Sequence, residues 1–478
     1  MSVQERFDLV VIGSGAAGRT AATVARGLGA SVALLERGRL GGECTWRGCV
    51  PSKTLLAVAR AAATPGRFGG LGLELKQPPE IDTAGVMDHV RSVIAKVAEH
   101  DSAEVLSGYG IKVVMGEARF VAPDAIEADG QRLMGRRFVI ATGSRPRFPS
   151  IPGLDGSVAL TSDTLWEIDT LPRSLAILGG GPVAVEMASA FTRLGTRVTM
   201  LVRSRLLKAE EPEIVERLAA VLVSQGVEII TGVSLERVAI GDRGVVLSTA
   251  DRVFEAERLL VAAGRTPVMP EGLELAGVHA DEHGVLTDAH MRTSAHHIFA
   301  AGDVTGTYHF THTGEREGIA AAVNALLPLG QKVSWEDVVW VLFSDPELAH
   351  LGMTEEQARA THGDAVRVRR YEFSKVDRAN AESATTGLAK YILDHRGHLL
   401  GAHILGERAG ELIQEVAVLL HHDMPFSALS PVLHAYPTFA DAVKRPADAE
   451  YAQRLRDNPA LRGALRLLVG PNDFTAEP

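Results

Sequence analysis

Cysteine is almost absent from this sequence: only Cys44 and Cys49 occur among 478 residues. A structural zinc centre usually needs four ligands, and no second cysteine pair is present to complete one. A disulfide between such close neighbours would close so short a loop that it would add little stability. The spacing lets the two side chains meet across about one turn of a helix. A redox-active dithiol fits best, and two unrelated buried thiols remain the alternative.

The sequence also lacks a charge-free apolar run near 18 residues, so no membrane-spanning helix is expected. Residues 1–8 are polar and acidic, unlike a secretory signal. The formal net charge is −10, which argues against nucleic acid or an anionic membrane as the main partner. We therefore expect a cytoplasmic protein, because in a reducing compartment a cysteine pair is more often catalytic than structural.

The first residues carry a dinucleotide fingerprint in its full context. A predicted strand at 7–12 is followed by a glycine-rich turn, an alanine-rich helix to about residue 28 and a second strand that ends in an acid. The glycines allow the backbone to approach a pyrophosphate, and the acid can accept a hydrogen bond from a ribose hydroxyl. The residues concerned are Gly13, Gly15, Gly18 and Glu36.

The fingerprint recurs at 174–202, with glycine-rich positions Gly179, Gly181 and Ala184. Val202 stands where the first unit has its acid, and Arg203 and Arg205 follow directly. Loss of the carboxylate removes repulsion toward a 2′-phosphate, which guanidinium groups can bind. The alternative is a solvated arginine-rich turn. Two units predict two dinucleotides, with NADPH preferred and NADH possible at the second.

Later segments predict further sheet edges and a separate domain. The chain is expected to cross between the two units at 141–146 and to return at 259–267. Asp303 ends an apolar strand, at the edge where doubly wound folds bind ligands, although it could also cap a helix. From about residue 333, mixed strands and helices suggest an α+β domain.

These motifs resemble those of the class I flavoprotein disulfide reductases, pyridine nucleotide-disulfide oxidoreductases that include dihydrolipoamide dehydrogenase, glutathione reductase and mercuric reductase. The resemblance covers about residues 5–450. Its most specific motif is Gly41-Gly42-x-Cys44-x-x-x-x-Cys49-x-Pro51-Ser52-Lys53, and the others are residues 141–146, 262–267, 300–304 and 406–415. It implies FAD in the first unit, a nicotinamide nucleotide in the second and a homodimer in which the partner chain completes the active site.

The fold class that follows is α/β, with two doubly wound dinucleotide-binding units for FAD and NAD(P) and a C-terminal α+β dimerisation domain. The expected divisions are 1–147 for the first part of the FAD-binding domain, 148–266 for the NAD(P)-binding domain, 267–332 for a central part that returns to the FAD-binding domain, 333–455 for the dimerisation domain and 456–478 for a tail.

The resemblance also implies roles for single residues. Cys49 corresponds to the thiolate next to the flavin, and Cys44 to the interchange thiol that meets the acceptor. Lys53 corresponds to the lysine near the flavin's reactive end, and Glu186 to its carboxylate partner beside the nicotinamide. A cation there favours anionic reduced flavin. Asp303 would hold the ribityl chain, and the remaining expected cofactor contacts are Gly42, Thr142, Gly143 and Gly264.

The sequence departs from the family at the acid–base pair that the dimer partner supplies. Disulfide-reducing members have a His directly before Pro-Thr and a Glu five residues later, whereas this chain has Tyr436 and Asp441. His434 lies two residues early, which in a strand is one full period, about 6.5–7 Å along the same face. Mercuric reductases also have Tyr here, but they add a C-terminal cysteine pair, and no cysteine follows Cys49. Pro182 replaces the family's aromatic nicotinamide gate.

The leading interpretation is a mercuric reductase-like enzyme without a metal centre of its own, which passes electrons from NADPH through FAD and the dithiol to an undetermined small-molecule or small-thiol acceptor. Dihydrolipoyl dehydrogenase is an alternative, favoured by His312 and residues 315–318 but opposed by Tyr436 and Val202. A flavin-dependent quinone or metal-ion reductase and a non-catalytic redox sensor are also compatible with the motifs. The complete set of dithiol, lysine and glutamate argues against the sensor.

Overall fold

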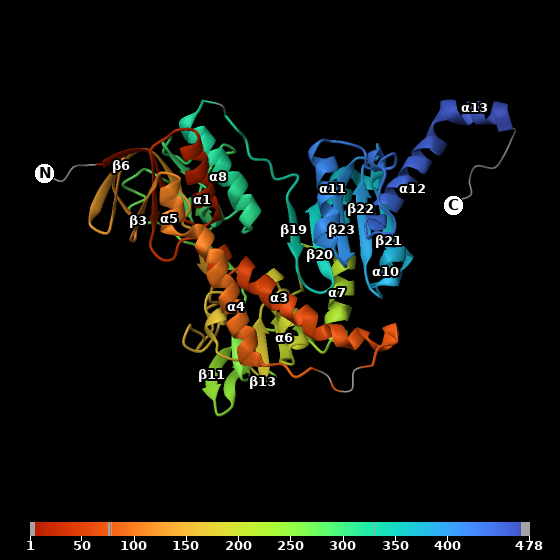
Figure 1. Ribbon diagram of the computed structural model, residues 1–478, viewed down its shortest axis with the longest axis horizontal. Helices are drawn as coiled ribbons and strands as arrows, with labels where there is room; N and C mark the ends of the chain where they lie inside the picture. Colours follow the sequence, from red (N-terminus) through yellow and green to blue (C-terminus); the bar gives the residue numbers. More distant parts are fainter. Residues whose placement is uncertain (1–4, 75–76, 78, 329, 470–478) are drawn as a thin grey trace. The chain divides into compact units, whose positions relative to one another are not determined.

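The computed structural model describes residues 5–74, 77, 79–328 and 330–469 (Figure 1). The chain forms two compact units. The first unit comprises residues 1–65, 76–206 and 225–335, and the second unit comprises 66–75, 207–224 and 336–478. The five-part division expected from the sequence is finer than this and stays a prediction. Among the described residues, no helix is both long and apolar enough to cross a bilayer.

The first unit contains a seven-stranded sheet around β1 (Glu5–Ile12). The other parallel strands are β2 (Val32–Glu36), β3 (Ile111–Met115), β6 (Gln131–Ile140) and β18 (Ile298–Ala300), and β4 (Arg119–Ala122) and β5 (Ala125–Ala128) extend it antiparallel. The last four residues of β1 are buried, as expected where helices cover both faces. Helices α1 (Ala16–Gly27) and α8 (Thr311–Leu326) lie side by side (Figure 1) and pack through alanines.

A second parallel sheet in the same unit repeats the pattern. Its order is β10 (Glu228–Thr231), β9 (Arg197–Val202), β8 (Ser174–Leu178) and β14 (Arg258–Val261), and α6 (Pro182–Arg193) follows β8. The two segments where the chain was expected to cross and to return lie together, because β7 (Ser144–Pro146) pairs antiparallel with β15 (Arg265–Pro267). The meander β11 (Arg237–Gly241), β12 (Gly244–Ser248) and β13 (Val253–Ala256) was not expected from the sequence.

Three helices link the two sheets in the chain: α3 (Cys49–Ala63), α4 (Thr83–Ala98) and α5 (Ala103–Gly108). The short helix α2 (Gly42–Trp46) precedes them. Cys44 lies in α2 and Cys49 begins α3, so the expectation that the pair spans one turn of a single helix is wrong. The helix breaks at Arg47 and Gly48, whose amides both donate to the Glu43 carbonyl at 2.8 and 2.7 Å.

The second unit is the expected α+β domain. Its five-stranded antiparallel sheet runs β19 (Val339–Leu342), β20 (Glu347–Gly352), β23 (Leu399–Gly406), β22 (Leu388–Leu393) and β21 (Arg367–Glu372). Its helices are α7 (Pro212–Ser224), α9 (Glu355–His362), α10 (Asp377–Ala381), α11 (Ala409–His421), α12 (Asp441–Asp457) and α13 (Pro459–Val469). Figure 1 shows α11 and α12 beside the strands, and residues of both contribute to one apolar core with Tyr391 and Phe426.

A buried ion cluster ties α7 to this sheet. The Lys390 side chain is 2% exposed, and its Nζ lies 2.7, 2.9 and 2.7 Å from carboxylates of Glu211, Glu213 and Glu355. The three carboxylates approach closely enough to hold a metal ion. The ammonium group already supplies the positive charge that they need, so the cluster is a structural ion pair network.

Candidate active site

The turn between β1 and α1 is shaped for a phosphate group. Gly13 has φ +100°, and a Cβ there would lie 2.3 Å from the Ala141 carbonyl oxygen. A Cβ at Gly18 would lie 1.9 Å from the Gly13 carbonyl oxygen, so both positions require glycine. Gly15 begins α1 with extended backbone and no side-chain cap, which leaves the helix's first amides for an anion. These features fit a dinucleotide pyrophosphate.

The acid of this first turn is held by the turn itself. Glu36, at the end of β2, accepts hydrogen bonds from the Ser14 amide at 2.9 Å and the Gly38 amide at 2.8 Å. Its carboxylate is therefore fixed beside the glycines, where a ribose of a bound dinucleotide would lie.

The second glycine-rich turn is built like the first, but the strand that follows its helix does not end in an acid. Gly179 has φ +144°, and a Cβ there would lie 2.2 Å from the Ala262 carbonyl oxygen. Gly181 begins α6 without a side-chain cap, and Ala184 is buried in that helix. Val202, at the end of β9, is buried and apolar, while Arg203 and Arg205 beside it are exposed. This turn therefore offers guanidinium groups rather than a carboxylate to a bound nucleotide.

The dithiol segment touches the first turn. Gly42 has φ +65°, and a Cβ there would lie 2.4 Å from the Gly15 Cα, so the backbone of α2 packs directly on the glycine-rich turn. The buried carboxylate of Asp101 holds this segment, because it accepts from Thr45 Oγ1 at 2.8 Å and pairs with Arg19. Sequence reasoning missed Asp101, since nothing local marks its contact with residues far away in the chain.

Cys44 and Cys49 are both free thiols and partly buried. The hydrogen bond from the Cys44 thiol, helped by Thr311 and by the charge of Lys53, outweighs burial and lowers the pKa of Cys49 to about 6. The same hydrogen bond and burial raise the pKa of Cys44 well above its ordinary value. The pair is thus polarised, with the negative charge on Cys49. This favours the expected roles, which stay predictions.

Thr311 is a second contact that the sequence did not reveal. Its Oγ1 lies 3.4 Å from the Cys49 Sγ. It is the first residue of α8, so the positive end of that helix also faces the thiolate. A helix N-terminus and a hydroxyl together stabilise negative charge on sulfur.

Lys53 joins the dithiol helix to the second glycine-rich turn. Its Nζ donates to both carboxylate oxygens of Glu186 at 3.1 and 3.0 Å. Lys53 comes from α3 and Glu186 from α6, the helix that follows the second turn. The Glu186 side chain is 8% exposed and that of Lys53 is 35% exposed, so the pair lies at the edge of the interior.

A polar network surrounds Asp303. Ser144 donates to its carboxylate, and Arg265 lies 3.6 Å from the same oxygen and donates to Ser144 Oγ at 2.7 Å. Arg265 also pairs with Glu43, the residue before Cys44. Burial raises the pKa of Glu43 to about 7 although Arg265 opposes it. Glu43 was not predicted, although its place inside the cysteine motif was a signal.

The other expected cofactor contacts lie directly before the two paired strands β7 and β15. Thr142 Oγ1 donates to the Val268 carbonyl at 2.5 Å, which holds the two crossing segments together. Gly143 and Gly264 both have positive φ, and a Cβ on Gly143 would meet open space. Whether these residues contact a cofactor stays a prediction.

Tyr436, Asp441 and His434 belong to the second unit. Residues 434–436 form neither strand nor helix, so the strand-based spacing argument for His434 is wrong. His434 Nδ1 lies 3.0 Å from the Val432 carbonyl and Nε2 lies 3.1 Å from Glu415. Both partners are hydrogen-bond acceptors, so each ring nitrogen of His434 already has a partner inside the second unit.

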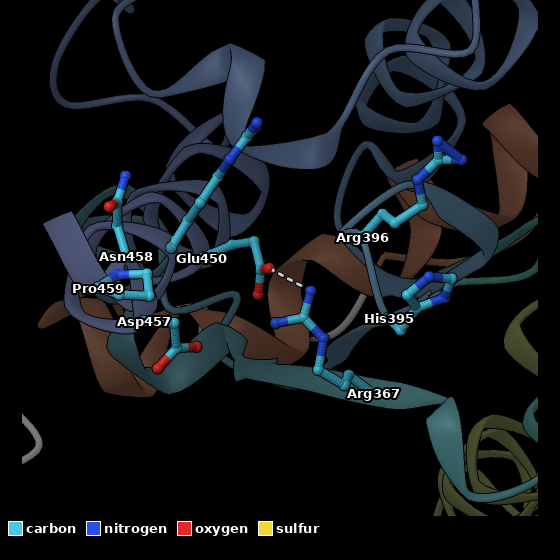
Figure 2. A pocket seen from close by; sticks show the side chains of 8 residues that line it. Arg367, His395, Arg396, Glu450, Asp457, Asn458 and Pro459 are labelled. Atoms are coloured by element: carbon cyan, nitrogen blue, oxygen red, sulfur yellow. Dashed lines mark ion pairs between the residues drawn. The ribbon is translucent and has the colours of Figure 1, made fainter.

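A surface cavity of about 370 Å³ lies elsewhere in the second unit. Figure 2 shows Arg367 and Glu450 facing each other inside it, joined by an ion pair of 2.7 Å. It contains neither a thiol nor a glycine-rich turn, so it is not the redox centre.

Two dinucleotide sheets that share one dithiol, followed by an α+β domain, define a class of enzymes that moves electrons between a nicotinamide nucleotide and thiols. The chain belongs to the pyridine nucleotide-disulphide oxidoreductase family: residues 7–325 match the family's model, and residues 338–447 match the model of its dimerisation domain. Enzymes of this family contain FAD and use NAD(P)H, and the dimerisation domain indicates a homodimer.

Known relatives fall into several branches of that family. A mercuric reductase from Bacillus cereus is 35% identical over 448 residues, 92% of this chain and 70% of that protein. A dihydrolipoyl dehydrogenase from Chlamydia muridarum is 30% identical over 449 residues, 92% of this chain and 96% of that protein. The solved HOCl-induced flavoprotein disulfide reductase RclA from Escherichia coli is similar at a TM-score of 0.82 and 29% identity, over 92% of this chain and 99% of that chain. The Cu(II) complex of RclA is similar at a TM-score of 0.83 and 28% identity, over 93% of this chain and 99% of that chain.

Proposed function

We propose that the chain passes two electrons from NADPH, through FAD, to the Cys44–Cys49 pair and on to a thiophilic metal ion, as a mercuric reductase-like enzyme. The observation that supports this most is the connection of the dithiol to both glycine-rich turns. Gly42 packs on the first turn, and the Lys53–Glu186 pair links α3 to the second. FAD, when bound, accepts hydride from the nicotinamide and passes the electron pair to a disulfide.

The chemistry balances around the dithiol. NADPH and one proton reduce the Cys44–Cys49 disulfide to two thiols and leave NADP⁺. The dithiol then gives its two electrons either to one Hg²⁺ ion bound by both sulfurs or to two Cu²⁺ ions, each reduced to Cu⁺. The disulfide re-forms, and two thiol protons go to water. Polarisation of the pair toward a Cys49 thiolate suits the first half of this cycle.

The raised pKa of Cys44 points to the acceptor class. A disulfide acceptor needs a base to make the Cys44 thiolate and an acid to protonate the leaving thiol, and a positioned His does both near neutral pH. This chain has Tyr436 in the place of that His, and both nitrogens of His434 are engaged. A metal ion deprotonates a coordinating thiol by itself, so it needs no base. Mercuric reductases among the relatives and the Cu(II) complex of RclA support the same class.

NADPH is the proposed nucleotide because Val202 replaces the acid of the first unit and Arg203 and Arg205 follow it. The proposed enzyme is a cytoplasmic homodimer, since the dithiol cycle requires a reducing supply of NADPH. In it the partner chain supplies Tyr436 and Asp441 to the Cys44 of the first chain, so that two complete sites form per dimer.

A second candidate is a dihydrolipoyl dehydrogenase. It is favoured by the relative of that name and by His312 and residues 315–318, which lie in α8 next to Thr311. A flavin-dependent quinone reductase, in which the cysteines are secondary, is the third candidate. Both candidates can be distinguished from the leading one by finding which acceptor is reduced only when Cys44 is present.

The test is steady-state and stopped-flow turnover of the holoenzyme with NADPH and five acceptors: Hg²⁺, Cu²⁺, a small quinone, glutathione disulfide and lipoamide. We expect metal-ion reduction that is lost in Cys44→Ser, and disulfide turnover lower by about 10²–10⁴-fold than a His-containing enzyme would give. The matched variants are Tyr436→His, which should raise disulfide turnover, and His434→Ala, which should not change it. Efficient disulfide turnover that His434→Ala abolishes would show that His434 is the base and that the proposed acceptor is wrong.

A further inference from the structure

The phenol of Tyr436 is held by a carboxylate that the sequence did not identify. The Tyr436 side chain is largely exposed, with 64% of its surface accessible, yet its hydroxyl donates to Asp377 Oδ2 at 2.6 Å. Hydrogen bonds to an ionised acceptor are short and about twice as strong as neutral ones. An exposed tyrosine would otherwise be free to rotate, so this bond determines where the phenol oxygen lies.

Asp377 is rigidly placed. It begins α10, and its neighbours Val376 and Ala379 are completely buried in the core of the second unit. The Asn380 side-chain amide donates to the Ser374 and Val376 carbonyls at 2.8 and 3.0 Å, which fixes the turn that enters the helix. The carboxylate of Asp377 is therefore presented from a rigid element rather than from a mobile loop.

Asp441 makes no hydrogen bond to the same phenol in the described part of the chain, although its charge acts on it. It is the first residue of α12, and its Oδ1 lies 3.6 Å from Arg445 Nε on the same helix. The charged groups around the Tyr436 hydroxyl are thus Asp377 from α10 and Asp441 and Arg445 from α12. Of these, only Asp377 accepts the phenol proton in a hydrogen bond.

We propose that Asp377 is the positioning residue of Tyr436, in the role that the family's pattern gives to Asp441, and that it keeps the phenol in its neutral, protonated form, which does not act as a base. The inference rests on the proposed function, in which Tyr436 of one chain acts on the Cys44 of the other. It deepens that function because it selects against acceptors that need a base at Cys44.

The physical reason is that ionising the phenol would remove the proton shared with Asp377 and leave two negative charges next to each other. The hydrogen bond to Asp377, its charge and the charge of Asp441 raise the pKa of Tyr436, while Arg445 opposes them. The basic form of this tyrosine is therefore scarcer at neutral pH than that of a free tyrosine. Because Cys44 is also held protonated, neither the Cys44 thiol nor the Tyr436 phenol supplies a base for thiol–disulfide exchange.

The test is a phenolate difference titration of the FAD-loaded dimer, in which the Tyr436→Phe spectrum is subtracted so that only Tyr436 contributes. We expect Asp377→Asn to bring the pKa of Tyr436 down toward about 10, the value of a free tyrosine. Asp441→Asn is the matched control, because it removes a facing charge without removing the hydrogen bond, and it should lower the pKa less. Asp377→Glu should restore the wild-type titration if the fold is intact.

Turnover as a function of pH separates this inference from the proposed function. With glutathione disulfide, the rise of activity at alkaline pH should move to lower pH in Asp377→Asn by the same amount as the titration. If Asp377→Asn titrates like the wild type, or if Asp441→Asn has the larger effect, the positioning role is refuted whatever the acceptor. If the titration moves and the pH profile does not, the phenol takes no part in the reaction, and the proposed role of Tyr436 is wrong.

Discussion

The contact between Thr311 and Cys49 allows a quantitative test of how this chain makes a thiolate. Thr311→Val replaces the hydroxyl by a methyl group of similar size, so it removes the 3.4 Å contact to Sγ and little else. A hydrogen bond to a charged group is worth about 1.5–3 kcal/mol, and one pKa unit corresponds to about 1.4 kcal/mol. Sulfur is a weak acceptor, so the lower end applies. The pKa of Cys49 should rise from about 6 to about 7.

The pKa of Cys49 should rise rather than fall because of the form that the hydroxyl stabilises. Thr311 donates to the thiolate, so its loss favours the thiol, and the thiolate then appears only at higher pH. At pH 6.5 the wild type should hold most of Cys49 as thiolate and Thr311→Val should hold most of it as thiol. The assay is the pH midpoint of the long-wavelength absorbance that the reduced holoenzyme gives when the Cys49 thiolate lies against the flavin. A second readout is the pH dependence of alkylation by iodoacetamide.

Thr311→Ser is the matched control, because it keeps the hydroxyl and loses only a methyl group. The Cys49 thiol of this variant should titrate near pH 6, as it does in the wild type. Equal midpoints for all three proteins would refute the reasoning, since they would mean that Cys44 and Lys53 alone set the pKa of Cys49.

Three further predictions concern the nucleotide site, the flavin and stability. The kcat/KM with NADPH should be about tenfold to a hundredfold higher than with NADH, because a charge-assisted contact is worth about 1.5–3 kcal/mol. Arg203→Glu should remove this preference, and equal kcat/KM values in the wild type would contradict the prediction. Pro182 is exposed at the start of α6, where the family's pattern has an aromatic residue. If reduced flavin is therefore less shielded, NADPH oxidase activity should be measurable and should fall in Pro182→Tyr, and an unchanged rate would place the shielding elsewhere. Lys390→Met should lower the free energy of unfolding by about 3–5 kcal/mol in urea, because it leaves three buried or partly buried carboxylates without their ammonium group. In the wild type, hydrogen bonds from Lys390 and Arg359 outweigh burial and hold the pKa of Glu355 at about 2, below the unfolded value of about 4.3, so stability should be lost as pH falls from about 4.3 to 2. In Lys390→Met this loss should be smaller, because Arg359 alone then holds the pKa of Glu355 down by hydrogen bonding. The same loss of stability at acid pH in the variant and the wild type would contradict this role of the cluster.

Local patterns in the sequence predicted the parts of the fold that local chemistry determines. The strands 174–178 and 197–202 lie where they were expected, because short apolar runs next to glycine-rich turns favour buried parallel strands. The meander β11–β13 was missed because its strands are only four or five residues long and partly exposed, which gives a weak signal. The stretch around His434 was misjudged as a strand, although Pro437 beside it disfavours one.

In the active site too, local sequence patterns predicted some residues and missed others. Cys44, Cys49 and Lys53 stand in one motif, and their neighbourhood follows from it. The contacts of Thr311 with Cys49, of Asp101 with Thr45 and of Asp377 with Tyr436 join residues 262, 56 and 59 positions apart. No periodicity links such positions, so only the folded chain reveals them. Among them, the contact of Thr311 helps to lower the pKa of Cys49, and the contact of Asp377 holds the Tyr436 hydroxyl.

The most direct test of the central claim, that the Cys44–Cys49 pair lies on the electron path, is an anaerobic reductive titration of the FAD-loaded enzyme with dithionite. A disulfide and a flavin each take two electrons, so the wild type should take up four electrons per FAD, and Cys44→Ser should take up two. The wild type should also develop long-wavelength absorbance after the first two electrons, and Cys49→Ser should not. A wild type that takes up only two electrons per FAD, or a Cys49→Ser variant that keeps the absorbance, would contradict the account.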